Sequence, residues 1–403
     1  DSGGGGGEAP SCVDATNNLA DATVAFNAVT PTDANYTAVC NDYSNALQDV
    51  LDVCGDSTGA IQALIDGKPF EETLEGDNVQ ISKIVEETLL SESKVKEILD
   101  TMFEENNKQI IFSGPPGTGK TWVAKAIARN VTDEDCIEIV QFHPSYGYEE
   151  FMVGLRPEGK EGGIEFKPHK GVVVEMAERA INNPDGTYIL IIDEMNRGNL
   201  PKIFGELMFL FEYRNQEISL QYEIDSSSSK FKLPENLYFI GTMNTADRSI
   251  EALDTALRRR FSFREMPPKH DLIGTVGNLK STNGKLGDID VVKILKTINN
   301  RIEKLIDKDH KIGHSYFLNI SSKQDLIDTF RDKVIPLLEE YFFGDFGKIS
   351  LVLGSSFISK ESADGVTFAT SNDYDPSIAN DLLERSVYEI TSESSWDFKA
   401  IYE

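Results

Sequence analysis

Apolar residues recur along this chain with the periods of helices and of buried strands. Between positions 79 and 102 they recur at three- and four-residue steps, which predicts a helix. Three mainly apolar runs, at 109–112, 188–192 and 237–242, predict strands, and 188–192 is continuous, as expected for a central strand of a parallel sheet. The first run leads into a glycine-rich segment and then into a helical pattern. The chain therefore alternates strands and helices, as α/β proteins do.

The last third of the chain carries helical periodicity instead of strand-like runs. Apolar positions between 291 and 306 predict one strong helix, and those between 326 and 338 predict another. Such stripes are typical of a packed core rather than of a cofactor site. We expect an α/β domain over residues 78–267, followed by a helical lid subdomain over residues 268–403.

The first 67 residues differ in composition from the rest. Residues 1–10 form a glycine-rich tether, and the apolar spacing within 11–67 predicts a small all-α module of unknown role. This stretch holds ten acidic residues, whereas the first basic residue of the chain is Lys68. The break marks a module boundary. The start of the chain resembles an extracytoplasmic segment, which conflicts with the cytoplasmic character expected of the remainder.

Three of the four cysteines lie in this N-terminal module, and two interpretations of them stay open. Cys12, Cys40 and Cys54 are either small buried hydrophobes or partners in a disulfide, with Cys12 joined to Cys40 or Cys54. A small module has a small core, and a disulfide would compensate for it. The module has no His, which disfavours a zinc site.

Overall charge limits the partners of the chain. The 39 basic and 67 acidic residues give a net charge of −28. Binding to a nucleic-acid backbone requires Lys and Arg to neutralise phosphates, so a broad DNA-binding face on this chain is disfavoured. The apolar runs are also far shorter than the roughly 20 residues of a membrane span, and we expect no such span.

Residues 114–121, with the sequence GPPGTGKT, match a phosphate-binding loop. They lie between a predicted strand and a predicted helix, where glycines allow backbone N–H groups to turn toward phosphates. The N-terminus of the helix adds positive charge. Lys120 would reach the β- and γ-phosphates, and Thr121 would bind Mg²⁺. The expected nucleotide-binding residues are Gly114, Pro115, Pro116, Gly117, Thr118, Gly119, Lys120 and Thr121.

Polar residues follow the other two apolar runs. Asp193 and Glu194 come directly after the second run, where Asp193 would hold Mg²⁺ through water and Glu194 would orient or deprotonate the attacking water. After the third run, Asn244 is a candidate for contact with the γ-phosphate or the attacking water. The alternative is an Asx turn that closes the strand. The arginines at 258–260 form either a solvated cluster or groups that reach a neighbouring subunit's nucleotide.

Other polar aromatic and histidine residues allow more than one interpretation. His143, Tyr146 and Tyr148 lie in a predicted loop, where they would meet a partner or a pore, or else pack locally. His314 could contact nucleotide or a neighbouring subunit, as could Lys311.

In their order, these motifs resemble those of AAA+ ATPases. GPPGTGKT, IIDEMNR, GTMNTADRS and ALRRRF follow one another along the chain. The segments MNTADRS at 243–249 and GHSYF at 313–317 are similar to those of the McrB-type branch, the motor subunits of modification-dependent restriction systems. The resemblance covers about 78–403. It implies a P-loop AAA+ α/β domain, with a parallel sheet flanked by helices, and a C-terminal helical lid.

The same resemblance implies a function and a set of site residues. McrB-type proteins hydrolyse GTP rather than ATP with Mg²⁺, form hexameric rings, and are stimulated by a separate McrC-type subunit that carries the nuclease. The metal site would comprise Thr121 and Asp193, and Arg258 is a further candidate to act on a neighbour. The implied catalytic residues are Glu194, Asn244, Asp247, Arg259 and Arg260.

The N-terminal module departs from the family pattern. It holds no basic patch and no recognisable base-flipping pocket, so DNA contact is expected through the complex rather than through this module. Two other functions stay open. One is a protein-remodelling AAA+ ATPase that recruits clients through the N-terminal module, and the other is a nucleotide-gated assembly scaffold with little turnover.

Overall fold

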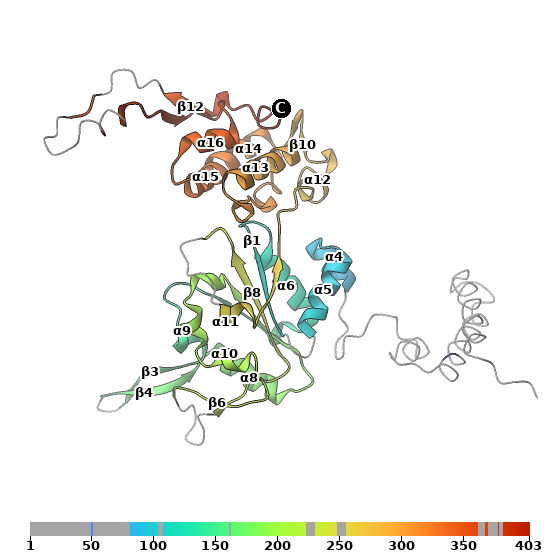
Figure 1. Cartoon of the computed structure of the whole chain (residues 1–403). Coiled ribbons are helices and arrows are strands. Elements are labelled where there is room, and N and C mark those ends of the chain that lie inside the picture. The colour runs from blue at the N-terminus through green and yellow to red at the C-terminus, as the bar shows by residue number, and fades with distance from the viewer. Residues whose placement is uncertain are drawn as a thin grey trace, which may run out of the picture. The chain divides into compact units, whose positions relative to one another are not determined.

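Figure 1 shows the computed structural model of the chain. The chain divides into two compact units, 1–79 and 80–403. The residues that the structure describes are 50, 81–103, 108–160, 163–222, 230–247, 255–361, 367–369, 378 and 382–403. The glycine-rich tether, the predicted helical module and the three cysteines of that module lie outside the described residues.

A five-stranded parallel sheet forms the centre of the α/β part. Its strand order is β2-β5-β8-β1-β9, and every neighbouring pair is parallel. All three apolar runs are confirmed as strands of this sheet, and they are its three adjacent central strands. The bounds are β1 (Gln109–Gly114), β2 (Ile137–Gln141), β5 (Tyr188–Asp193), β8 (Leu237–Asn244) and β9 (Ser262–Glu265).

Helices cover both faces of this sheet, because successive side chains of a strand point to opposite faces. One set of strand residues joins the hydrophobic core that includes α8 (Val172–Asn182): Ile111, Leu190, Ile192 and Phe239. The other set, with Ile110 and Ile191, faces α5 (Glu92–Phe103) and α6 (Lys120–Val131), which contact the strands. Burial on both sides explains why the strands read as mainly apolar runs.

The segment before β1 forms two helices, whereas the spacing over 79–102 predicted one. The chain leaves α4 (Ile81–Thr88) at Leu89, which adopts a left-handed conformation with φ of 57°. Ser91 then starts α5, because its Oγ accepts a hydrogen bond from the N–H of Lys94 at 3.3 Å. Local capping thus interrupts an apolar spacing that is continuous in the sequence.

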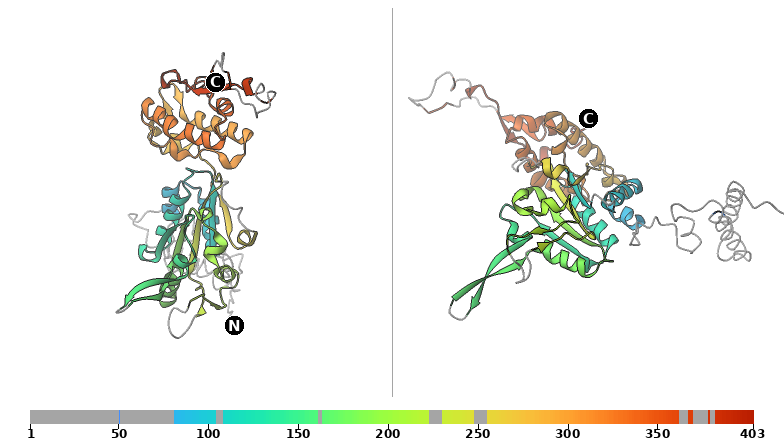
Figure 2. Two further views of the ribbon diagram at one scale, coloured as in Figure 1. Left: turned by 90° about the vertical axis from the view of Figure 1, so that its left-hand side faces the viewer. Right: turned by 60° about the horizontal axis from the view of Figure 1, so that its bottom comes forward.

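A long antiparallel hairpin, which the sequence analysis did not predict, extends from the α/β part (Figure 2). It comprises β3 (Val153–Lys160) and β4 (Gly163–Lys170). Ile164 and Phe166 on β4 are 72% and 64% exposed. The hairpin therefore carries apolar side chains that have no cover within the described part of the chain.

Shorter elements complete the α/β part. They are η1 (Glu134–Cys136), α7 (Tyr148–Phe151), η2 (Met195–Arg197), α9 (Leu200–Phe204), α10 (Leu207–Leu210), β6 (Ile218–Ser219), β7 (Lys230–Phe231) and α11 (Thr255–Arg258).

The C-terminal part is mainly helical and has its own hydrophobic core. It also contains two small two-stranded sheets, which the helical periodicity did not predict. Its elements are α12 (Leu272–Thr275), η3 (Lys280–Thr282), β10 (Lys285–Leu286), β11 (Ile289–Asp290), α13 (Val291–Leu305), η4 (Lys308–His310), η5 (His314–Tyr316), α14 (Lys323–Thr329), η6 (Phe330–Val334), α15 (Ile335–Tyr341), α16 (Phe346–Leu353), β12 (Ile358–Glu361), β13 (Val387–Ile390) and η7 (Glu393–Ser395).

Both long helical patterns of the lid are confirmed. The first is α13, and the second runs through α14, the π-helical turn η6 and α15. The wide turn lies just before Pro336, which has no N–H to donate to the preceding turn. No helix among the described residues is long and apolar enough to cross a membrane.

Candidate functional site

The segment between β1 and α6 has the backbone of a phosphate-binding loop. Gly117 and Gly119 have φ values of 76° and 84°, which glycine adopts without strain. The loop ends at the N-terminus of α6, where free N–H groups and the helix dipole favour an anion. Thr118 braces the loop, because its Oγ1 donates to the carbonyl oxygen of Pro115 at 3.0 Å. This geometry suits the binding of a phosphate chain.

Lys120 lies inside this loop and is only 6% exposed. Its Nζ donates to the carbonyl oxygens of Gly114 and Pro115 at 3.0 and 2.8 Å. Burial lowers the pKa of Lys120 to about 8, although the carboxylates of Glu194 and Asp193 oppose this shift. Near neutral pH the side chain therefore keeps its positive charge beside the loop.

Asp193 ends β5 and collects two hydroxyl donors at one oxygen. Its Oδ1 accepts hydrogen bonds from Thr121 Oγ1 at 2.6 Å and from Thr242 Oγ1 at 2.5 Å. Thr121 comes from α6 and Thr242 from β8, so three elements converge on this carboxylate. A carboxylate and a threonine hydroxyl are the hard oxygen ligands that Mg²⁺ prefers, and Thr121 and Asp193 fit that ion.

Thr242 is a site residue that the sequence analysis missed. It is 2% exposed, and its Oγ1 also accepts a hydrogen bond from the backbone N–H of Glu194 at 3.2 Å. A signal existed in the sequence, because Thr242 is the last residue of the third run and Asp193 directly follows the second. Neighbouring parallel strands place their carboxyl ends side by side.

Glu194 is held in an uncommon backbone conformation with φ of 53°. Both of its carboxylate oxygens accept hydrogen bonds from Asn244 Nδ2, at 2.8 and 3.0 Å. Burial is the largest cause that raises the pKa of Glu194, and Arg197 opposes it. A carboxylate with a raised pKa and a fixed direction is suited to accept a proton from water.

The amide of Asn244 is thus engaged with Glu194, and its contact with the γ-phosphate or the attacking water stays a prediction. Arg197 Nε lies 3.3 Å from Glu194 Oε2, and its Nη2 lies 3.4 Å from Asp247 Oδ2. The neighbouring Asn196 donates its Nδ2 hydrogen to the carbonyl oxygen of Asn244 at 2.9 Å. The turn after the acidic pair, which was not assigned a role from the sequence, therefore links Glu194, Asn244 and Asp247.

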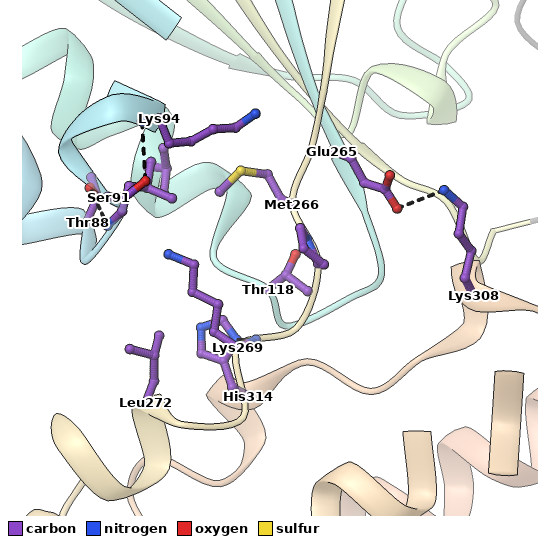
Figure 3. Close-up of a pocket in the computed structure, with 13 residues that line it drawn as sticks. Thr88, Ser91, Lys94, Thr118, Glu265, Met266, Lys269, Leu272, Lys308 and His314 are labelled. Carbon is purple, nitrogen blue, oxygen red and sulfur yellow. Dashed lines mark hydrogen bonds and ion pairs between the residues drawn. The ribbon is translucent and has the colours of Figure 1, made fainter. Parts of the chain in front are cut away.

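A cavity of about 640 Å³ lies beside the phosphate loop (Figure 3). Its apolar lining includes Leu90, Val123, Met266 and Leu272, and Thr118 connects it to the loop. His314 also lines it, and its Nδ1 accepts a hydrogen bond from the N–H of Lys269 at 3.2 Å. Burial lowers the pKa of His314 to about 4, so its ring is neutral near pH 7. An apolar slot with a few polar groups fits a flat heterocyclic base.

Comparisons with known proteins agree with this geometry. Residues 109–261 match the AAA domain of the dynein-related subfamily, and residues 290–350 match the alpha-helical lid domain of McrB. The EcoKMcrB subunit of a type IV methyl-directed restriction enzyme of Escherichia coli K12 is 39% identical over 255 residues.

This chain carries an AAA domain followed by a McrB-type lid domain. The match covers 59% of the chain and 54% of the E. coli protein, so the chain spans about half the length of that relative. A second relative is the YdiS component of the type II restriction enzyme BsuMI of Bacillus subtilis 168. It is 26% identical over 321 residues, which cover 69% of the chain and 92% of YdiS.

The three consecutive arginines at 258–260 differ in their surroundings. Arg260 is directed into its own subunit, where its side chain is 11% exposed and its Nη2 lies 2.7 Å from Glu212 Oε2. The side chain of Arg259 is 65% exposed. The guanidinium of Arg258 lies over the ring of Phe263. Arg259, whose Nη2 lies 3.9 Å from the same Glu212 oxygen, is thus the more exposed of the two, and the predicted role of each arginine in a neighbouring site stays a prediction.

The aromatic residues after β2 pack locally. The ring of Tyr146 stacks on Phe142 with centroids 4.9 Å apart. Tyr148 is 6% exposed, and its hydroxyl donates to Glu206 Oε1 at 2.6 Å. These contacts favour the packing alternative for both tyrosines. His143 is exposed on the same loop.

Proposed function

We propose that this chain is a Mg²⁺-dependent nucleoside triphosphate hydrolase, with GTP as its substrate, and that it acts as the motor subunit of a McrBC-like restriction system. The observation that carries the proposal is the fixed carboxylate of Glu194 beside Asp193 and the phosphate loop. Both oxygens of Glu194 are held by Asn244, 2.8 and 3.0 Å away. The relatives from restriction enzymes support the wider role.

Each site residue then has a definite task. Lys120 contacts the β- and γ-phosphates, while the backbone of the loop surrounds them. Thr121 and Asp193 hold Mg²⁺, which neutralises phosphate charge when it is bound. Glu194 accepts a proton from the attacking water, and Asn244 fixes the direction of its carboxylate.

The polar rim of the base cavity supports GTP over ATP. Lys94 and Lys269 line this cavity (Figure 3). Guanine presents two acceptors, O6 and N7, on one edge, whereas adenine replaces O6 with an amino donor. Lys308 lines the cavity as well, paired with Glu265 at 2.9 Å. Ammonium groups are donors only, so a rim with three lysines favours the guanine edge.

A neighbouring copy would complete the site. Arg259 lies after α11, its side chain is 65% exposed, and its Nη2 lies 3.9 Å from Glu212 Oε2. In a ring, hexameric as in the family, its guanidinium would reach the neighbour's phosphates and stabilise the charge that develops during hydrolysis. A McrC-type nuclease subunit is the proposed partner, and DNA would be contacted through that complex in the cytoplasm.

Steady-state hydrolysis of GTP and ATP, measured side by side with Mg²⁺, tests the proposal. Preference for GTP that rises with a McrC-type partner is the expected result. Glu194→Gln should bind nucleotide and lose turnover. Preference for ATP with no response to the partner would favour a protein-remodelling ATPase, and slow turnover that Glu194→Gln leaves unchanged would favour an assembly scaffold.

A further inference from the structure

A segment of the lid lies directly against the backbone of the phosphate loop. The N–H of Gly313 donates to the carbonyl oxygen of Pro116 at 3.0 Å, and the N–H of Ser315 donates to that of Gly117 at 3.1 Å. These backbone groups are almost 200 positions apart in the sequence. The contact thus joins the lid to the loop that is proposed to bind phosphate.

Gly313 is required here by space rather than by conformation. Its φ of −70° and ψ of 156° are available to any residue. A Cβ at this position, however, would lie 2.0 Å from the carbonyl carbon of Gly117 and 2.4 Å from the carbonyl oxygen of Pro116. Both obstacles are backbone atoms, so no side-chain rotation could relieve the overlap.

The phosphate loop also presents a glycine at the same contact. A Cβ on Gly117 would lie 2.6 Å from Cε2 of Tyr316 and 2.8 Å from Oγ of Ser315. A Cβ on Gly313 would thus meet the backbone of Gly117, whereas a Cβ on Gly117 would meet the side chains that follow Gly313. The backbone atoms that a Cβ on Gly313 would meet have no rotamers with which to adjust, so this is the tighter side of the contact.

The lid holds this segment rigidly. Asn299 of α13 is 1% exposed, and its amide makes a pair of hydrogen bonds with the backbone of Ile312. Its Oδ1 accepts from the N–H of Ile312 at 2.6 Å, and its Nδ2 donates to the carbonyl oxygen of Ile312 at 2.9 Å. A displacement of α13 would therefore displace Gly313 and, through its hydrogen bond, the phosphate loop.

We propose that Gly313 is a positioning residue, through which the seating of the lid sets the conformation of the phosphate loop and hence nucleotide affinity. This inference rests on the proposed nucleotide-binding function. It assigns the lid a mechanical role through backbone contact, separate from any contact that the lid makes with the base or the phosphates.

Gly313→Ala tests the contact, with Gly347→Ala as the matched control. Gly347 lies in α16 of the same lid, and a Cβ there meets only side chains, the nearest being Asp345 Oδ1 at 3.2 Å. Hydrogen–deuterium exchange of the nucleotide-free full chain reports the amides of Gly313 and Ser315. Binding of fluorescent mant-GTP and mant-ATP with Mg²⁺ reports affinity.

In the wild type and in Gly347→Ala, the two amides should be protected. Gly313→Ala should lose this protection and bind the fluorescent nucleotides about tenfold more weakly, since two hydrogen bonds are lost. Thermal unfolding of the lid should change little. Retained protection, or lost protection with unchanged affinity, would overturn the proposal.

A second variant covers the case in which Gly313→Ala does not fold. Tyr316→Ala removes the ring beside Gly117 and adds no atoms, so it should weaken nucleotide binding in the same direction by a smaller factor. Unchanged affinity in a folded Tyr316→Ala protein would contradict the coupling. Failure of the wild type to bind either nucleotide would instead reject the proposed function, because the exchange measurement needs no nucleotide.

Discussion

Removal of the Asn244 amide isolates the feature on which the proposed hydrolysis depends. In Asn244→Ala, Glu194 loses the donor that contacts both of its oxygens, at 2.8 and 3.0 Å. Arg197 remains, but its Nε lies farther away at 3.3 Å and its side chain is 49% exposed. The backbone of Glu194 should therefore stay where it is, while its carboxylate loses its fixed orientation.

The size of the effect follows from the kind of hydrogen bond that is lost. A hydrogen bond to a charged group contributes about 1.5–3 kcal/mol. If that contribution serves to orient Glu194 in the transition state, kcat should fall about 10- to 150-fold, since about 1.4 kcal/mol corresponds to a factor of ten. Nucleotide affinity should change little, because the side chain of Asn244 contacts Glu194, and the backbone that pairs with Gly114 is unchanged by the substitution.

The assay is a double-mutant cycle in single-turnover hydrolysis, with Asn244→Ala combined with Glu194→Gln. Asn244 acts through Glu194, so the double variant should be no slower than Glu194→Gln alone. Asn244→Asp adds a second carboxylate, which should raise the pKa of Glu194 further and move the pH–rate profile to higher pH. Independent, multiplying losses in the cycle would refute the reasoning.

Three further outcomes are expected. Burial lowers the pKa of Lys120 to about 8, and only the protonated amine attracts phosphate, so nucleotide affinity should weaken above pH 8 and isothermal titration across pH 7–9.5 measures this. Thr242→Val removes the acceptor for the N–H of Glu194 and a donor to Asp193, and it should lower the free energy of unfolding by about 1–3 kcal/mol in denaturant titrations. The pKa of His314 lies at about 4 in the folded chain against 6.5 ordinarily, so the unfolded chain takes up the proton first as the pH falls. Between pH 7 and pH 5 this should cost about 2 kcal/mol of stability, which a His314→Gln variant should not lose.

Sequence periodicity determined much of the architecture because it reports burial along a single element. The runs that became β1, β5 and β8 are mainly apolar, as is usual for strands covered on both faces. The glycine-rich segment before α6 and the acidic pair after β5 were recognisable for the same local reason. Each of these two motifs is adjacent in the sequence to the strand or helix that positions it. The carboxyl ends of neighbouring parallel strands lie at the same edge of the sheet.

Apolar periodicity does not predict where a helix is capped or which strands pair with each other. The apolar spacing over 79–102 is continuous, yet Leu89 and the cap at Ser91 divide it into two helices. The hairpin of β3 and β4 depends on pairing between two strands, for which neither strand alone carries a strong signal.

Tertiary structure alone decided which side chains act together. Asn244 could have closed a turn, and only the packing of β8 beside β5 shows its amide on Glu194. Three consecutive arginines are equivalent in the sequence, whereas the folded chain leaves the side chain of Arg259 65% exposed and that of Arg260 11% exposed. The meeting of Gly313 with Gly117 was likewise invisible, because it depends on distances between residues far apart in the chain. The pattern of apolar residues specifies most helices and strands of this protein, because it reports local burial. The contacts between site residues depend on how those elements pack together.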